Sequence, residues 1–379
     1  MNLRRLLLIG VGLLISLNSQ AKLNSDYLVN PSIDTPNPHT QCLIQMAYEI
    51  RQLQIANIDQ FKAASTMDDD AQVDQLVRRR LQQIYQGQRK DKAVVFIHGF
   101  MASTFETEEL SKYLNETSGF TVVNPLLAGF GSNYKYANKF ATINEWQKSI
   151  LKTVNIVSKC YKEIAIIGGS LGGALAMDFV FNVDNQFVKI ENNAKLSQLV
   201  LLSPYVSPAI PGSRRILGTL DTLGIKGVPL ATLNLWGLFG DDPDLKELLE
   251  NKNFYLAKFP IQTGLEVMKL SENLLSLGRD IKSPISVFAA LSKHDKIVSF
   301  EESRDFLQAR FENLKTLIIY DEADDGTSNT VATHVPHHLW QKKRNPDVPN
   351  LFKEIAEFIQ ARSNTTDLRI HSPTNEIHR

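Results

Sequence analysis

The stretch that most constrains the fold of this chain is residues 164–174, which read IAIIGGSLGGA. Its first four residues are apolar and typical of a short buried strand, whereas the small residues at its end suit a helix. A Gly-x-Ser-x-Gly motif centred on Ser170 lies between them. This order predicts a nucleophile elbow, a turn so sharp that the neighbours must be small and the serine hydroxyl is exposed at the end of a sheet.

A serine at such a turn predicts nucleophilic catalysis only if the chain also supplies a base, an acid and donors for an oxyanion. The hydroxyl is a poor nucleophile until an imidazole takes its proton, which histidine can do near neutral pH. A carboxylate then fixes the tautomer of the imidazole and stabilises the imidazolium. The helix expected after Ser170 contributes backbone N–H groups and the positive end of its dipole.

A second oxyanion donor is predicted after the strand expected at residues 93–97, which is followed by His98, Gly99 and Phe100. In this pattern the backbone N–H after the glycine can point into the oxyanion hole, so we assign that donor to Phe100. We interpret His98 as a structural imidazole that braces the loop, because it precedes the nucleophile in the wrong part of the fold for the base.

The candidate acid and base follow the serine along the chain. Asp295 lies just past a strand expected at residues 285–291, where open α/β sheets place functional side chains. Asp321, which ends the last expected strand, is the alternative acid. The order is therefore nucleophile, acid, histidine.

Three histidines in the loop before the closing helix are candidates for the base. We favour His337 for its place in the strand–loop–helix order, with His334 second and His338 third. The same loop has a cluster of acidic residues at positions 321–325, whose spacing fits no defined calcium loop. We therefore expect a solvated acidic loop there, and neither a metal nor a cofactor.

Strands and helices are expected to alternate from residue 93 onward, which predicts an α/β domain with a mostly parallel sheet and helices on both faces. We assign this domain to residues 91–362. The alternation breaks at residues 209–283, an apolar insert expected to form a cap or lid over a pocket for a partly hydrophobic substrate. With 41 basic and 41 acidic residues, the chain gives no electrostatic reason to expect nucleic acid as a partner.

The first 21 residues have the pattern of a secretory signal peptide, with a basic start, an apolar run and a small-x-small site before Lys22. We therefore expect export, to the periplasm or the medium, with an uncleaved N-terminal anchor as the alternative. In an oxidising compartment Cys42 and Cys160 could form a disulfide, and two separate buried thiols are the alternative.

The two ends of the mature chain are expected to differ in structure. Residues 22–90 are predicted to form an N-terminal helical extension, because apolar residues recur at helical spacing in residues 41–57 and 71–85. Three arginines at positions 78–80 are interpreted as a solvated face of the second helix. A polar tail without regular structure is expected over residues 363–379.

Several segments resemble the α/β-hydrolases of the bacterial carboxylesterase and monoacylglycerol-lipase type, a group similar to the S33 serine aminopeptidases. These segments are residues 96–103, 119–125, 129–131, 164–173, 281–284 and 292–298. The resemblance implies the α/β-hydrolase fold, ester hydrolysis, and oxyanion donors at Phe100 and Leu171. The chain departs from the family where it reads Gly129-Phe130-Gly131 in place of the usual Gly-His-Gly, and in its longer, histidine-rich loop.

The sequence therefore predicts an exported serine hydrolase that cleaves short- or medium-chain esters or monoacyl lipids through an acyl-enzyme. The expected partner is a small-molecule or lipid ester, and transient contact with a lipid surface is left open. Two other functions also remain open. One is acyl transfer to an alcohol on the same triad, and the other is non-catalytic binding by a protein of the same fold.

Overall fold

The computed structural model describes residues 37–62, 80–100, 102–131, 139–209, 219, 260–278, 280–293, 295, 297–320, 347–361 and 369–371. The chain divides into two compact units, Met1–Gln41 and Cys42–Arg379. Residues 37–41 of the first unit hold the beginning of helix α2 (Pro38–Lys62). The interactions described below lie within the second unit. The signal peptide predicted for residues 1–21 lies outside the described residues.

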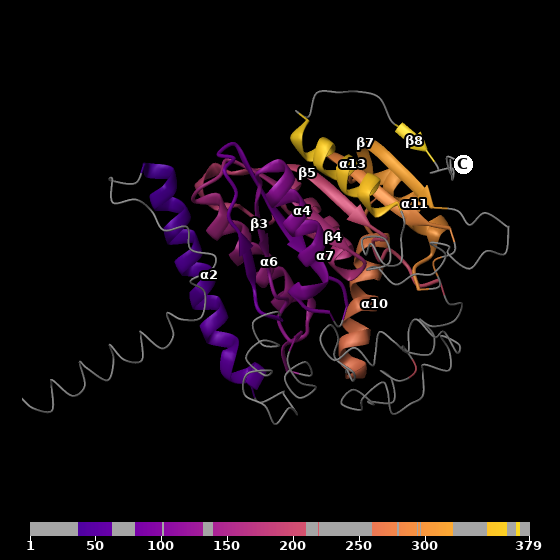
Figure 1. Ribbon diagram of the computed structural model, residues 1–379. Coiled ribbons are helices and arrows are strands. Elements are labelled where there is room, and N and C mark those ends of the chain that lie inside the picture. Colours follow the sequence, from indigo (N-terminus) through magenta and orange to yellow (C-terminus); the bar gives the residue numbers. More distant parts are fainter. Residues whose placement is uncertain are drawn as a thin grey trace, which may run out of the picture. The chain divides into compact units, whose positions relative to one another are not determined.

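One sheet forms the centre of the second unit and has eight strands within the described residues (Figure 1). In spatial order these are β1 (Gln83–Tyr85), β3 (Thr121–Asn124), β2 (Lys92–Ile97), β4 (Glu163–Gly169), β5 (Lys195–Leu202), β6 (Ser283–Ser292), β7 (Phe311–Tyr320) and β8 (Arg369–His371). All neighbouring strands are parallel except β1 and β3, which are antiparallel. The expected mostly parallel sheet is confirmed.

Helices cover both faces of this sheet, as its apolar strands require. Every residue of β2, which reads KAVVFI, is buried, and such continuous apolar runs are typical of parallel strands with both faces covered. One core joins the sheet to α2, α6 (Ile143–Ser158), α7 (Leu171–Asp184), α10 (Ile261–Leu275) and α11 (Phe300–Arg310). The other joins it to α4 (Glu108–Ser118) and α13 (Val348–Gln360). A 3₁₀ turn (Thr104–Thr107) leads into α4, and another (Glu191–Asn193) leads into β5.

A disulfide between Cys42 and Cys160 joins helix α2 to the residues that follow α6. The two Cα atoms are 5.6 Å apart, within the usual range for a bridge. Lys159, which precedes Cys160, also forms an ion pair with Glu49 of α2, with an Nζ–Oε2 distance of 2.7 Å. The sequence left open a disulfide or two separate buried thiols, and the structure has the disulfide.

Both ends of the sheet correct the sequence-based expectations. The helix predicted over residues 71–85 is wrong at its end, because Gln83–Tyr85 form β1 and pair with β3. The tail predicted to lack regular structure contains β8, which pairs with β7 from Arg369 to His371. Short edge strands of three residues carry too little periodic pattern to be recognised from sequence alone.

The insert expected at residues 209–283 is described mainly at its C-terminal end. There α10 packs against α7, and its residues Ile261, Leu270 and Leu274 are buried in the core on that face of the sheet. Residues 210–218 and 220–259, on which the expectation of a cap rests, lie outside the described residues.

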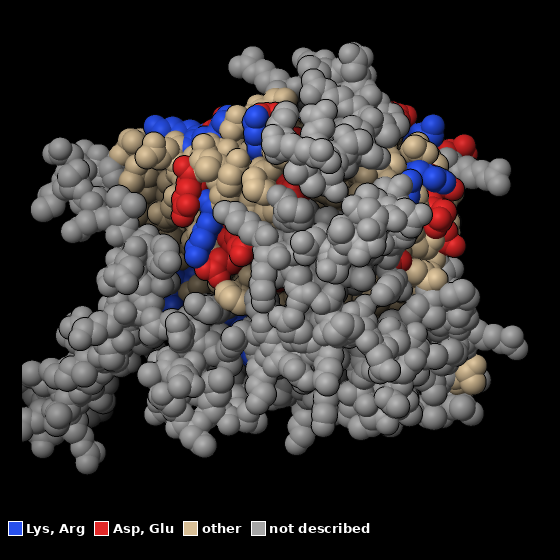
Figure 2. Space-filling view, turned by 45° about the vertical axis from the view of Figure 1, so that its right-hand side comes forward, with Lys and Arg blue, Asp and Glu red and all other residues tan. Residues whose placement is uncertain are grey.

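The described surface carries charges of both signs side by side. Figure 2 shows basic and acidic side chains next to one another on the face it presents. Several are paired, such as Lys112 with Glu108, Lys148 with Glu145, and Arg304 with Asp305. In the part of the chain that the structure describes, no helix combines the length and the hydropathy needed to cross a bilayer.

Candidate active site

Ser170 lies on a strained turn between the end of β4 and the start of α7. Its backbone angles are φ 48° and ψ −115°, a region that non-glycine residues rarely adopt. The turn is held by its neighbours: the Ser170 N–H donates to the Leu202 carbonyl (2.9 Å), and the Ser170 carbonyl accepts from Tyr205 (2.9 Å). The structure therefore contains the predicted elbow, and the surrounding strands maintain its strain.

Two glycines of the motif allow the elbow to form. A Cβ at Gly172 would lie 2.2 Å from the carbonyl oxygen of Ile97, which is far inside van der Waals contact. A Cβ at Gly168 would lie 2.4 Å from the carbonyl oxygen of Gly172. The missing side chains let the first turn of α7 lie directly against the end of β2, so that Ser170 comes next to the loop that begins at His98.

His98 braces this loop from a fully buried position. Its Nδ1–H donates to the Gly99 carbonyl (2.9 Å), and its Nε2 accepts from the Leu127 N–H (3.1 Å). Burial lowers the pKa of His98, against opposing contributions from Glu106 and the Gly99 carbonyl. The ring is therefore neutral with its proton on Nδ1, as both hydrogen bonds require. This geometry agrees with the structural role inferred from the sequence.

The peptide between Gly99 and Phe100 is oriented from both sides of Gly99. The Gly99 N–H donates to Oε2 of Glu106 (2.6 Å), whose side chain is buried, and the Gly99 carbonyl accepts from His98. A trans peptide holds its C=O and N–H in opposite directions, so the Phe100 N–H points away from His98. A Cβ at Gly99 would lie 3.6 Å from the Gly169 carbonyl, which places this peptide beside the elbow.

Glu106 has a positioning role that the sequence did not reveal. It lies in the 3₁₀ turn Thr104–Thr107 and is only 4% exposed. Its bond to the Gly99 N–H fixes the loop that carries Phe100. Acidic residues in such a polar stretch, which also holds Glu108 and Glu109, are usually solvated, and a buried role could have been suspected only because Glu106 follows Gly99 by seven residues.

The second predicted oxyanion donor, Leu171, is the first residue of α7. N–H groups in the first turn of a helix have no acceptor within the helix. They also lie at the positive end of the helix dipole, where a developing oxyanion is stabilised. The backbone geometry at Leu171 therefore suits the role that the resemblance implies.

Asp295 follows β6 at the carboxyl edge of the sheet, the same edge at which β4 ends in Gly169. One strand, β5, separates β4 from β6. The side chain is 9% exposed, and its Oδ1 accepts from the N–H groups of Ile297 (2.9 Å) and Val298 (2.7 Å). These two bonds hold the carboxylate in a fixed orientation.

The candidate bases and the alternative acid lie in one segment, residues 321–346, which is outside the described residues. His334, His337, His338 and Asp321 therefore have no described position. The chain enters this segment from Tyr320 at the end of β7. The Tyr320 carbonyl accepts from the Lys293 N–H (3.0 Å), so the segment begins beside the turn that carries Asp295.

The structure explains why this chain can have Gly129-Phe130-Gly131 where Gly-His-Gly is usual. Both glycines have positive φ, 82° and 71°, as the backbone there requires. Phe130 is buried and stacks on Trp146, with ring centroids 5.5 Å apart. Its edges contact both His98 and Phe100, each at a centroid distance of 5.8 Å. A phenylalanine here thus supports the oxyanion loop by packing.

Comparison with known proteins identifies the group to which this arrangement belongs. A family model described as serine aminopeptidase, S33, matches residues 88–324, more than half of the chain. The chain belongs to this family. The matched region includes Ser170 and Asp295 and ends before the three candidate histidines. The α/β-hydrolase fold expected from the sequence is thereby confirmed.

Individual relatives of this S33 family member are distant. A carboxylesterase of Bacillus subtilis (strain 168) is 32% identical over 94 residues, which cover 24% of this chain and 37% of that protein. A monoacylglycerol lipase of Paleococcus ferrophilus is similar in structure, with a TM-score of 0.53, 15% identity, and 73% of this chain and 97% of that chain covered. A soluble variant of the Saccharomyces cerevisiae monoglyceride lipase, in complex with a substrate analogue, has the same TM-score at 14% identity, covering 73% and 90%. At these identities the two structures establish the fold alone.

Within the described residues, no group of histidine, cysteine, aspartate or glutamate side chains is arranged to hold a metal ion.

Proposed function

We propose that this protein is a serine hydrolase of carboxylic esters, with Ser170 as the nucleophile and Asp295 as the acid of its triad. The observation that carries the proposal is the strained Ser170 elbow beside the oriented Gly99–Phe100 peptide. Nucleophile and oxyanion donors must be set within a few ångströms of one carbonyl, and the short distance between Gly99 and Gly169 next to the elbow supports this assignment.

The mechanism assigns one task to each group. The Ser170 oxygen attacks the ester carbonyl while a histidine takes its proton, and the N–H groups of Phe100 and Leu171 stabilise the oxyanion. The histidine then protonates the leaving alcohol, and an acyl-enzyme remains. Water activated by the same histidine hydrolyses it, which releases the acid and restores the serine. Asp295 orients the histidine, for which we propose His337, with His334 as the alternative.

We propose short- or medium-chain esters or monoacyl lipids as substrates. The names of the relatives support this class, since they include a carboxylesterase and two lipases of monoacylglycerols. The apolar residues of the insert at 209–283 suit such a substrate.

We further propose that the protein is exported. The pattern of the first 21 residues and the Cys42–Cys160 bridge support this proposal, because disulfides persist in oxidising compartments. Cell fractionation, together with mass analysis of the N-terminus of the exported form, tests it. A protein that stays in the cytoplasm with its thiols reduced would overturn it.

The catalytic proposal is tested with an active-site reagent and a series of p-nitrophenyl esters. An organophosphate should add a single adduct to Ser170 and abolish activity, and Ser170→Ala should lower kcat by about 10³-fold or more. Ser203→Ala is the matched control, because Ser203 is also buried at a strand end with positive φ (42°) and should leave the adduct intact. An adduct that persists on Ser170→Ala protein would refute the assignment.

The base is identified in the same assay with single substitutions of His334, His337 and His338 by alanine. We expect His337→Ala to lose activity to the same extent as Ser170→Ala, and the other two to retain it. Product analysis with an added alcohol distinguishes hydrolysis from acyl transfer, since only transfer makes a new ester.

A further inference from the structure

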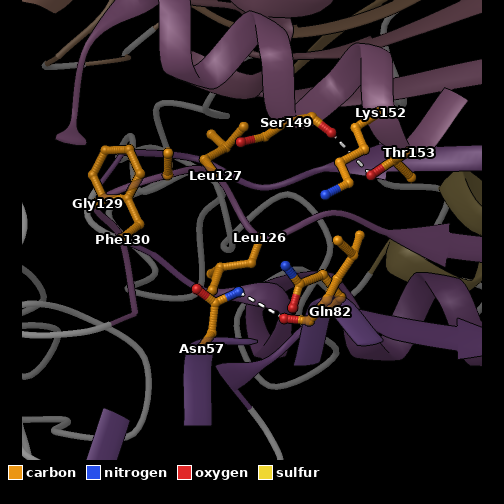
Figure 3. A pocket seen from close by; sticks show the side chains of 11 residues that line it. Asn57, Gln82, Leu126, Leu127, Gly129, Phe130, Ser149, Lys152 and Thr153 are labelled. Carbon is orange, nitrogen blue, oxygen red and sulfur yellow. Dashed lines mark hydrogen bonds between the residues drawn. The ribbon is translucent and has the colours of Figure 1, made fainter. Parts of the chain in front are cut away.

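A small pocket lies beside residues 126–130, in the loop that follows β3. It encloses about 150 Å³ between α2, α6 and the loop that follows β3 (Figure 3). This volume accommodates about five water molecules or one organic acid of similar size. The catalytic residues assigned above are absent from its lining.

Two nitrogen-bearing side chains extend into the same space. Lys152 of α6 is an exposed residue without a carboxylate partner among the described residues, and Figure 3 shows its ammonium group directed over the pocket. Gln82, which precedes β1, is only 6% exposed, and its side chain makes no hydrogen bond with the described residues. Its Oε1 is the shielded atom of the amide. Figure 3 shows the amide nitrogen directed toward the pocket.

The loop that follows β3 contributes apolar side chains to the lining. The hydroxyl groups that α6 contributes already have hydrogen-bond partners. Leu126, Leu127 and Phe130 form the apolar wall. The hydroxyls of Ser149 and Thr153 donate to helix carbonyls, at 2.8 and 3.0 Å, and so do not need a ligand. The Gln82 amide nitrogen has no acceptor among the described residues, and a bound acceptor in the pocket would supply one.

We propose that this pocket binds a short-chain aliphatic carboxylate. The carboxylate group accepts from the Lys152 ammonium and the Gln82 amide N–H, and the alkyl chain lies against Leu126, Leu127 and Phe130. Two donors and no described acidic side chain in the lining select an anion, and the apolar wall selects one with an alkyl part.

Occupancy of the pocket is coupled to the oxyanion loop through two contacts. Phe130 contacts both Phe100 and His98 on its other side, and Leu127 donates its backbone N–H to His98. A ligand that restrains Phe130 and Leu127 thus restrains the loop that orients the Phe100 N–H. Given the proposed function, the acid released by hydrolysis belongs to the ligand class of this second site, and its binding should raise kcat.

The binding test uses isothermal titration calorimetry with sodium butyrate on the full chain. We expect saturable binding with a dissociation constant on the order of 1 mM, weakened at least tenfold in Lys152→Met. Lys148→Met is the matched control, because Lys148 lies one turn earlier on α6, is exposed and pairs with Glu145. Butanol and sodium phosphate, which lack the charge and the alkyl chain respectively, should bind at least tenfold more weakly. Any butyrate that binds near Ser170 would add the same binding signal in wild type, Lys152→Met and Lys148→Met.

Two results would overturn the proposed site. One is the absence of saturable butyrate binding, which would mean that the pocket holds water only. The other is equal binding by wild type and Lys152→Met, which would place butyrate elsewhere. Calorimetry does not need turnover, so it stands even if the protein is not an esterase. With turnover, butyrate should raise kcat at saturating ester by about twofold in wild type and not in Lys152→Met. An unchanged wild-type kcat would overturn the coupling.

Discussion

The residue that connects the most parts of the site is His98, which is fully buried at the start of the loop that carries Phe100. Its two hydrogen bonds tie Gly99 on one side to Leu127 on the other. The bond to Leu127 needs the neutral ring, because a protonated ring has no acceptor for the Leu127 N–H. The geometry of the loop therefore depends on a histidine that stays uncharged.

The lowered pKa of His98 predicts how stability responds to acid. The unfolded histidine takes up a proton as the pH falls below about 6.5, whereas the buried ring resists it. The contribution of His98 to stability is therefore present above that pH and is lost as the pH falls below it. We expect the slope of unfolding free energy between pH 7 and 5 to be flatter in His98→Gln, by up to about 1.4 kcal/mol per pH unit. Urea unfolding at several pH values measures this, and identical slopes in the two proteins would contradict it.

At the scale of elements, the site depends on the close approach of α7 to the end of β2. The carbonyl oxygens of Ile97 and His98 would lie 2.2 and 2.6 Å from a Cβ at position 172. Backbone atoms at the end of a central strand cannot move aside without disturbing the sheet. The elbow therefore tolerates only glycine at this position.

This approach predicts a large difference between two glycine substitutions. Gly172→Ala should lower the unfolding free energy by about 3 kcal/mol and abolish hydrolysis, because the helix must shift away from β2. Gly278→Ala is the control, since a Cβ there would come no closer than 3.9 Å to the side chain of Ile281. It should change stability by less than about 1 kcal/mol. Thermal or urea unfolding of both variants measures the difference, and similar losses would disprove the steric argument.

The elements that could be predicted from sequence are those with strong local patterns. Helix α6 (Ile143–Ser158) has such a pattern, because its apolar residues recur at helical spacing and Thr142 caps its first turn. Ser170, His98 and Phe100 were placed because a sharp turn and a close backbone approach demand particular residue types. The edge strands β1 and β8 were missed, since their pairing is decided by the neighbouring strand and not by three residues of local sequence. The Lys152 pocket depends on contacts between distant segments, for which a single sequence carries no local signal, and the role of Glu106 depends on burial that its polar surroundings in the sequence do not indicate.

At the scale of the whole molecule, the Cys42–Cys160 bridge closes a loop with a sequence separation of 118 residues. Cross-linking so long a loop removes conformational freedom from the unfolded chain. The loop holds β1, β2, β3, α4 and α6, so it includes one side of the sheet and the whole oxyanion loop. The bridge thus stabilises the part of the fold that residues 42–160 form.

Removing the bridge should lower the unfolding free energy by about 3–5 kcal/mol. The comparison is between wild type and the double variant Cys42→Ser with Cys160→Ser, each with and without dithiothreitol during urea unfolding. Reduced wild type should match the double variant, and dithiothreitol should not change the double variant. A wild-type protein that is indifferent to the reductant would show that the bridge contributes little.

The same bridge determines what a protease can accomplish. A single cut anywhere between the two cysteines yields two polypeptides that remain joined through sulfur. When the cut lies after Phe100, the piece that carries Phe100 cannot diffuse away from the piece that carries Ser170, and the nicked protein can still reassemble as one molecule. For the exported protein proposed above, such a covalent tether keeps the two pieces of a nicked chain in one molecule.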